Sequence, residues 1–473
     1  MTLSFSEGPS TLAQMKSSVL SVVLALSILL GICVPLAAQE ASPSSTPYPA
    51  PSIAPGTDPA AATRAWLDTV PADKRAKSDA YFEGGYWLIL WNFLLAVAIS
   101  IFLLASRISA RLRDFAERTT RFKFLQIILY SVPVLLLIYI LGFPLNVYER
   151  FFREHAYGMA TQNFSQWFRE QLVMVAVDLV VTSLLLIGLY AVFRRAPRTW
   201  WIWGTIVSIV FTTLGIILSP VYIEPLFNTY KPLNDPAISE PILAMARANE
   251  IPVTQVFEVD ASRQTKRVSA NVSGFLGTTR IALNDNLLKE CTLPEIREVM
   301  AHEMGHYVLN HSFKLVIYFS LFFLIGFIAL RAFYDGAVRR WGASWGIRVA
   351  PVLDNSIPAD PANAPLETHG AYGIADPAGL PLLSLIFGAV FFLLTPVINT
   401  AVRVTEREAD AFSINTAREP DGMARVALKL GEYRKLDPSP MEEFIFFDHP
   451  SGRARIRMAM DWKAAHLPCG STE

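Results

Sequence analysis

The residues most capable of chemistry in this sequence lie in one short segment, His302-Glu303-Met304-Gly305-His306. Two histidines four residues apart project from the same face of a helix, so both imidazoles can bind one metal ion. Zinc is the metal that this pattern favours. Glu303, beside the first histidine, can take a proton from a water molecule that the metal activates. The chain holds only 7 histidines, so a chance match to this pattern is rare.

A third metal ligand must come from another part of the chain. His311 follows five residues after His306, but no glycine turn intervenes. Further on, Glu406 and Asp410 share one face of a second predicted helix. One of these carboxylates can bind the metal, while the other can accept a hydrogen bond from a ligand histidine and fix its tautomer. Glu408 is offset on this helix and is expected to face solvent.

The elements that must position these residues are mostly apolar. Hydrophobic residues make up 52% of the chain and charged residues 17%, with a mean hydropathy of +0.35. Six apolar blocks are each long enough, at ~1.5 Å per residue, to cross a hydrocarbon layer ~30 Å thick. We therefore expect six membrane-spanning helices, at Tyr86–Ala105, Phe124–Asn146, Gln171–Phe193, Thr199–Val221, Leu315–Tyr334 and Ala378–Ala401. Asp178, inside the third block, is either a functional carboxyl or a partner within the helix bundle.

Charge and cysteine content exclude other classes of protein. The 41 basic residues cancel the 41 acidic residues, so no overall basic field is available to bind nucleic acid. The three cysteines are far apart and form neither a disulfide framework nor a cysteine-based zinc site.

Apolar and polar segments divide the chain into six parts. The first is either a signal peptide or a membrane anchor, because the block Val19–Ala38 is apolar and ends in small residues. A Pro/Ser/Ala-rich stretch follows and is predicted to be a linker. The remaining parts are a four-span region, a polar segment running into the fifth span, a loop, and the sixth span with the C-terminal segment. The predicted boundaries are 1–38, 39–80, 81–221, 222–335, 336–377 and 378–473.

Two polar segments, Tyr222–Lys314 and Arg403–Glu473, carry the candidate site. The second is expected to be mostly helical. The sequence therefore predicts a mainly α, polytopic helical membrane protein with a small β-sheet. In the first segment we expect a helix at Ile238–Asn249, a strand at Gln255–Val259, a pair of strands around Gly274–Arg280, and a helix from Pro294 onward.

The order of several motifs resembles the type I CAAX prenyl proteases, a family of integral-membrane zinc proteases. The HtpX-type heat-shock proteases are similar at a greater distance. The resemblance extends from about Thr63 to about Trp462 and implies a zinc protease domain of the gluzincin type. The motifs that carry it are Pro225-Leu226-Phe227-Asn228, Ser269-Ala270-Asn271 with Gly274, the HExGH segment with His311, Arg403 with Glu406-x-x-Ala409-Asp410, and His449-Pro450.

The resemblance implies a role for each matching residue. It implies one zinc ion per chain, held by His302, His306 and Glu406. Glu303 is implied to be the general base and later the proton donor, and Asp410 the residue that orients a ligand histidine.

The same resemblance implies how a substrate is held. The stretch Ser269 to Gly274 is similar to the edge strand on which these proteases bind an extended peptide. Within it, Asn271 and Gly274 are the expected substrate contacts.

The C-terminal motifs depart from the family pattern. Val402 replaces the usual serine before Arg403, a residue expected to support the site. Ser451 replaces the second proline of the His449-Pro450 motif. His449 is expected either to stabilise an oxyanion or only to precede a helix with proline in its first turn, and Arg453 is expected to contact the substrate.

Basic residues gather in three predicted loops, at Arg107–Lys123, Arg194–Arg198 and Arg339–Arg348. The positive-inside rule places such loops in the cytoplasm and the candidate site on the periplasmic side of a bacterial inner membrane. The family resemblance implies the cytosolic side instead.

The expected function is a zinc metalloendopeptidase of membrane protein processing or quality control. Its partners are a peptide or protein substrate and the lipid bilayer, without nucleic acid, and the sequence does not predict an oligomeric state. The alternatives are a CAAX prenyl protease acting on prenylated proteins, and a non-enzymatic membrane chaperone or channel with a relic metal site.

Overall fold

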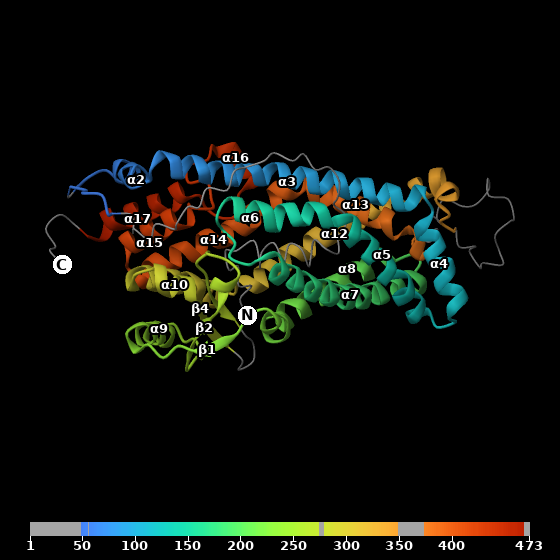
Figure 1. Cartoon of the computed structure of the whole chain (residues 1–473), viewed down its shortest axis with the longest axis horizontal. Helices are drawn as coiled ribbons and strands as arrows, with labels where there is room; N and C mark the ends of the chain where they lie inside the picture. Colours follow the sequence, from blue (N-terminus) through green and yellow to red (C-terminus); the bar gives the residue numbers. More distant parts are fainter. Residues whose placement is uncertain (1–48, 55, 274–278, 349–372, 468–473) are drawn as a thin grey trace.

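The computed structural model describes residues 49–54, 56–273, 279–348 and 373–467, and these form an elongated, mainly helical molecule (Figure 1). Long apolar helices run along its length. Short helices and a small sheet are gathered at one end, and helix α4 (Ile108–Thr119) lies at the other. The predicted fold class is confirmed. The two alternatives for residues 1–38 lie outside the described residues.

Five of the predicted spans are confirmed as single helices long and apolar enough to cross a membrane. The sixth predicted span is not one straight helix. It is divided into α13 (Leu380–Leu393) and α14 (Thr395–Ala417), which are bent by 58°. Pro396 in the first turn of α14 has no N–H to donate to the preceding turn, which explains the break. The five single helices are α3 (Ala72–Ala105), α5 (Lys123–Val147), α7 (Phe164–Arg195), α8 (Trp200–Leu218) and α12 (His311–Trp345).

Two predicted boundaries are wrong. The predicted linker 39–80 contains helix α2 (Pro59–Leu67) and the start of α3. Helix α2 forms because Asp58 accepts hydrogen bonds from the first free N–H groups, and it is held by burial of Trp66 in a cluster with α15 (Pro420–Leu430) and α17 (Gly452–His466). The predicted loop 336–377 begins inside α12, whose helix continues to Trp345.

A four-stranded sheet lies beside the candidate site. Its strands follow the order β1-β2-β4-β3, so β3 is an edge strand, antiparallel to β4, with Asn271 opposite Ala282. The predicted strand at Gln255–Val259 and the predicted pair around Gly274–Arg280 are confirmed. The side chains of Val272, Ile281 and Met300 join the sheet to the helices that cover it. The elements are β1 (Tyr230–Pro232), α9 (Pro236–Ala248), β2 (Val256–Val259), β3 (Ala270–Ser273), β4 (Arg280–Asn284), α10 (Asp285–Glu290) and α11 (Leu293–Val308).

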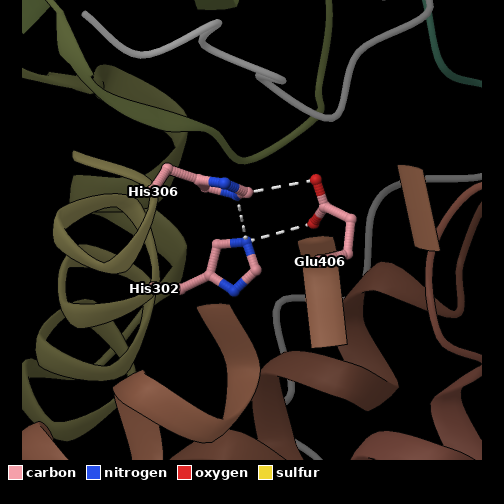
Figure 2. Close-up of side chains that lie close together, drawn as sticks. All are labelled: His302, His306 and Glu406. Carbon is pink, nitrogen blue, oxygen red and sulfur yellow. Dashed lines mark hydrogen bonds and ion pairs between the residues drawn. The ribbon is translucent and has the colours of Figure 1, made fainter. Parts of the chain in front are cut away.

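Helices α11 and α14 face each other and carry the candidate metal ligands (Figure 2). Gly305 makes their close approach possible: a Cβ atom there would lie 3.3 Å from Cα of Ala409. Helix α11 begins at a capping box formed by Thr292 and Glu295. It ends before α12, because Asn310 between them takes a left-handed conformation with φ of 54°.

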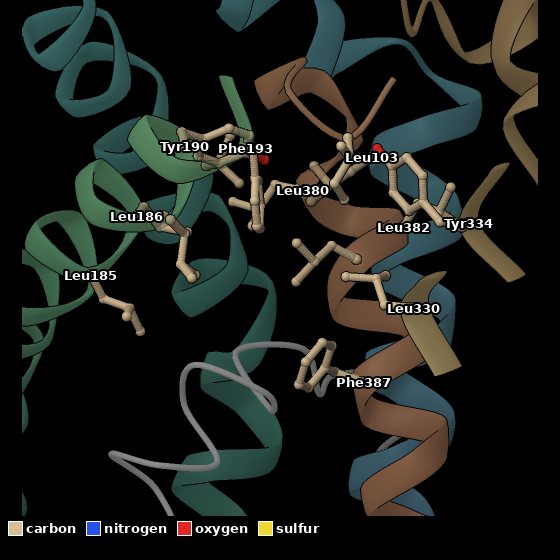
Figure 3. Close-up of a cluster of buried hydrophobic side chains, with 14 of the residues drawn as sticks. Leu103, Leu185, Leu186, Tyr190, Phe193, Leu330, Tyr334, Leu380, Leu382 and Phe387 are labelled. Atoms are coloured by element: carbon tan, nitrogen blue, oxygen red, sulfur yellow. The ribbon is translucent and has the colours of Figure 1, made fainter. Parts of the chain in front are cut away.

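The long helices share one buried apolar core (Figure 3). Leu103 of α3, Tyr190 of α7 and Leu330 of α12 are all inaccessible or nearly so. On the outside of the same helices, large apolar side chains are exposed, as expected for surfaces that contact lipid. Asp178 accepts a hydrogen bond from Tyr139 at 2.7 Å, so this carboxyl has a partner within the bundle.

We expect the substitution Gly204→Ala to destabilise the bundle. A Cβ atom at this position of α8 would overlap the buried ring of Phe327 on α12, and overpacking of this kind costs about 1–3 kcal/mol. The measurement is the thermal unfolding midpoint in detergent. Gly215→Ala, on the same helix, is the matched control because its Cβ atom would meet nothing within 4 Å. Equal midpoints for the two variants would contradict the packing described.

Candidate metal centre

Three predicted ligands converge on one point (Figure 2). The Nε2 atoms of His302 and His306 lie 3.1 Å apart. The carboxylate oxygens of Glu406 lie 3.2 Å from the first Nε2 atom and 3.5 Å from the second. Glu406 is fully buried. Within the part of the chain that the structure describes, this is the only such group of three or more histidine, cysteine or acidic side chains.

The chemistry of these atoms fits a metal ion. Asp410 lies 2.9 Å from Nδ1 of His302, so that nitrogen carries the hydrogen and Nε2 presents a lone pair. Three lone-pair atoms that face one another repel unless a cation lies between them. Ligand atoms on a tetrahedral ion at ~2.0–2.1 Å are ~3.3 Å apart, close to the distances found here. Three protein ligands would leave a bound zinc ion one position for water or substrate.

His306 is oriented by a residue that the sequence analysis did not assign. Its Nδ1 atom lies 2.8 Å from Nδ1 of His311, whose Nε2 atom lies 3.0 Å from Glu408. A carboxylate can only accept hydrogen bonds, so His311 donates one to Glu408 from Nε2. Its Nδ1 atom then accepts a hydrogen bond from Nδ1 of His306. Glu408 is 40% exposed, in line with the expectation that it faces solvent, but it also pairs with His311 and Lys314. No spacing rule reveals this contact, because it depends on the turn at Asn310.

The pKa values of the two predicted ligand histidines are shifted in opposite directions. Burial lowers the pKa of His306 to about 3, so its imidazole is neutral. Burial also acts to lower the pKa of His302, but hydrogen bonds and charge from Asp410 and Glu406 raise it well above the usual value. The carboxylates thus attract a cation to the position that Nε2 of His302 faces, and a metal ion can take the place of the proton there.

Two other predicted residues adjoin the three ligands. Glu303 is buried and lines a pocket together with His302. His449 is buried, with Nε2 at 3.3 Å from Glu406 and Nδ1 at 2.9 Å from Asp448. Pro450 does not lie in the first turn of α17, as the second alternative for His449 expected, because the helix is capped by Ser451 and Pro450 lies before the cap.

Two arginines contact residues that surround the three predicted ligands. Arg403 supports it indirectly, donating to the carbonyls of Glu443 and Phe447 next to the His449 segment. Arg455 is buried and donates from Nε to Asp410 at 2.9 Å, a contact that the sequence analysis missed.

The structure does not bring Arg453 to the site. Its side chain is 44% exposed and pairs with Asp437 at 3.1 Å. Residues two apart point to nearly opposite sides of a helix, which explains why Arg455 reaches the centre and Arg453 does not.

The predicted substrate strand borders the same pocket. Ser269 and Ala270 line it together with His302 and Glu303. Asn271 follows on β3, and its Oδ1 atom is buried and has no hydrogen-bond partner among the described residues. Gly274 lies outside the described residues.

We expect His311→Leu to weaken metal binding by ~10–100-fold, the usual effect of removing a residue that orients a ligand histidine. The measurement is the dissociation constant of a divalent metal ion in competition with a chelator. His466→Leu, at an exposed position of α17, is the control and should leave the constant unchanged. An unchanged metal affinity in a folded His311→Leu variant would contradict the orienting role.

Comparison with known proteins agrees with this geometry. A model of the N-terminal region of CAAX prenyl proteases, with five membrane helices, matches residues 60–229, and the model of peptidase family M48 matches residues 232–463. The metalloprotease YhfN of Bacillus subtilis is 26% identical over 376 residues, which cover 78% of this chain and 82% of that protein. CAAX prenyl protease 1 of Saccharomyces cerevisiae is 24% identical over 337 residues, 67% and 68% of the two chains.

A solved structure has the same fold. The crystal structure of S. mikatae Ste24p superposes with a TM-score of 0.65 at 19% identity, covering 83% of this chain and 90% of that one. Together the two family models span residues 60 to 463 almost without a gap. The chain therefore belongs to the CAAX prenyl protease group of peptidase family M48 and is an integral-membrane metalloprotease.

Proposed function

We propose that the protein is a zinc endopeptidase that cleaves peptide bonds of proteins at the membrane, in their processing or quality control. The observation that carries this proposal is the convergence of His302, His306 and Glu406 beside Glu303. One zinc ion per chain is the metal that this donor set favours. When bound, it would polarise the scissile carbonyl and make water a stronger nucleophile.

The chain's own residues supply the other steps of hydrolysis. Glu303 accepts the proton of the attacking water and passes it to the leaving amine. His449 stabilises the negative charge that develops on the carbonyl oxygen. Asp410 and Arg403 hold the surrounding side chains in place, as their hydrogen bonds to His302 and to the segment before His449 suggest.

Substrate binding is proposed to use the edge strand. An extended peptide can add to β3 through backbone hydrogen bonds, because the strand order leaves β3 at the side of the sheet. Asn271, with a buried Oδ1 atom that has no partner among the described residues, is a proposed substrate contact. Gly274 is likewise proposed as a substrate contact.

The proposed domain organisation follows from these roles. A four-span N-terminal region supports a catalytic segment that carries the first two ligands. The sixth, bent span and the C-terminal segment supply the third ligand and His449.

We expect Glu303→Gln to abolish peptide cleavage, with a loss of at least ~100-fold, and to leave the metal bound. The amide keeps the size of the side chain but cannot accept a proton from water. The measurements are peptide cleavage and the metal content of the purified protein. Glu240→Gln, at an exposed position of α9, is the control and should retain full activity. Retained activity in Glu303→Gln would refute the role of Glu303, and a wild-type protein that binds metal but cleaves nothing would favour a relic site.

A second candidate function is removal of C-terminal residues from prenylated proteins. It is favoured by the similarity to the yeast protein whose name records that activity. The peptide assay separates the two functions when a farnesylated CAAX peptide is compared with the same peptide without the lipid. Cleavage that requires the lipid supports the second candidate, and cleavage of both supports a general endopeptidase.

The proposed location is the inner membrane of a bacterium, with the catalytic end on the periplasmic side. The basic segments support this orientation. Arg348 pairs with Glu117 at 2.6 Å and Arg107 donates to the carbonyl of Ser344 at 2.7 Å, so two of these segments adjoin each other at the end marked by α4 (Figure 1). The sheet and α17 lie at the opposite end.

We expect alkaline phosphatase fused after Glu473 to be active, because α17 belongs to the catalytic end and the positive-inside rule keeps the arginine-rich end in the cytoplasm. A fluorescent protein that folds only in the cytosol should be dark at the same position. Fusions placed between Arg339 and Arg348 are the matched control, and their two signals should be reversed. Cytosolic fluorescence of the C-terminal fusion without phosphatase activity would place the catalytic end in the cytosol.

A further inference from the structure

A pocket opens beside the metal ligands on the side of the edge strand. His302 and Glu303 form one wall, and Ser269 and Ala270 form another. The pocket holds about 550 Å³ of empty space, part of it open to solvent. Because it adjoins both the metal ligands and β3, a peptide bound along β3 would direct into it a side chain close to the bond that is cleaved. Its apolar walls are Val299, Met423, Val426, Ala427 and Leu430, from α11 and α15.

A carboxyl group lies in this otherwise apolar pocket. Glu298 stands one helical turn before His302, on the same face of α11. It is only 3% exposed. Its Oε1 atom accepts a hydrogen bond from Ser413 at 2.6 Å. Its Oε2 atom has no hydrogen-bond partner among the described residues. Glu298 is one of the residues that line the pocket.

Glu298 forms no ion pair with any of the described residues. Arg455, the basic side chain that lines the pocket, donates to Asp410 at 2.9 Å. A divalent metal ion would balance the charges of Glu406 and Glu303. Burial and the charge of Asp410 raise the pKa of Glu298 to about 8, and the hydrogen bond from Ser413 and the charge of His302 oppose them only in part. A buried carboxyl in this position favours any ligand that brings a positive charge.

We propose that this pocket is a specificity subsite for a lysine or arginine side chain next to the scissile bond, with Glu298 as the group that pairs with its charged end. The aliphatic stem of such a side chain fits the apolar walls, and its N–H groups can reach the unpaired Oε2 atom. The proposal rests on the proposed endopeptidase function and narrows its substrates. A preference for basic residues would distinguish these substrates from a CAAX sequence, in which aliphatic residues follow the cysteine.

The test compares peptides that differ at one residue. The metal-loaded, full-length protein is given two series of peptides, varied on either side of the cleaved bond, with Lys, Arg, Gln or Met at the varied position. Methionine and glutamine are long side chains, one atom shorter than lysine, and carry no charge. We expect kcat/KM for the basic peptides to exceed that for the methionine peptide by roughly 10–100-fold on one side of the bond. No preference, or a preference for Gln or Met on both sides, would overturn the proposal.

Variants of Glu298 show whether this residue causes the preference. Glu298→Gln keeps a partner for Ser413 but cannot be ionised, and we expect the ratio of basic to methionine peptide to fall by ~10-fold or more. Glu298→Asp keeps the charge and should keep the preference for basic residues. Glu240→Gln, on the exposed face of α9, is the control and should leave the ratio unchanged. An unchanged ratio in Glu298→Gln would mean that Glu298 and Ser413 only join α11 to α14.

The ratio remains interpretable if a variant loses overall activity, because both peptides are then affected alike. If the Glu298→Gln variant does not fold, the preference of the wild-type protein for basic over methionine peptides decides the test. If the wild-type protein cleaves none of the peptides, the proposed function fails and not the subsite alone.

Discussion

The close contact between α11 and α14 is the constraint on which the metal centre depends. Gly305 lies between the proposed ligand His306 and the proposed base Glu303, and a Cβ atom at this position would meet Phe412 at 3.1 Å and the backbone of Ala409 at 3.3 Å. Ala409 in turn stands between Glu406 and Asp410. Two small residues therefore allow the helix axes to approach until the ligands of one helix reach those of the other. The bend that begins α14 sets the direction from which Glu406 arrives.

The buried charged side chains around this contact are linked to one another by hydrogen bonds and ion pairs. Glu406 faces both histidines, Asp410 holds His302, and Arg455 holds Asp410. On the other side, His306 is linked through His311 to the partly exposed Glu408. Each link leaves a ligand nitrogen with its lone pair directed at the metal position. Removing one member would leave an uncompensated charge or donor in a buried place, which is far more costly than the pair itself is stabilising.

The sequence predicted those features that follow from local periodicity. The spans, the helix of the HExGH segment and the strand at 255–259 follow from apolar patterns. The placement of Glu406 and Asp410 on one helix face follows from their spacing. The sequence did not predict features that depend on contacts between distant parts of the chain. Helix α2 is stabilised by burial of Trp66 against α15 and α17, which lie roughly 350 to 400 residues further along the chain. Arg455 rather than Arg453 reaches the centre because of the face that α17 presents. His311 could not be assigned because its role depends on the conformation of Asn310.

The membrane helices do more than anchor the catalytic end. Helix α3 has 34 residues, ~51 Å at ~1.5 Å per residue, which exceeds a hydrocarbon layer of ~30 Å. Its N-terminal turns therefore extend beyond the bilayer, where Ser78 donates to the carbonyl of Arg434 at 3.0 Å and Tyr81 donates to Glu154 at 2.6 Å. The catalytic end is thus joined to the membrane-spanning region by a continuous helix. If a substrate adds to β3 in extended form, as proposed, the bundle would limit which segments of a membrane-bound polypeptide can reach this strand.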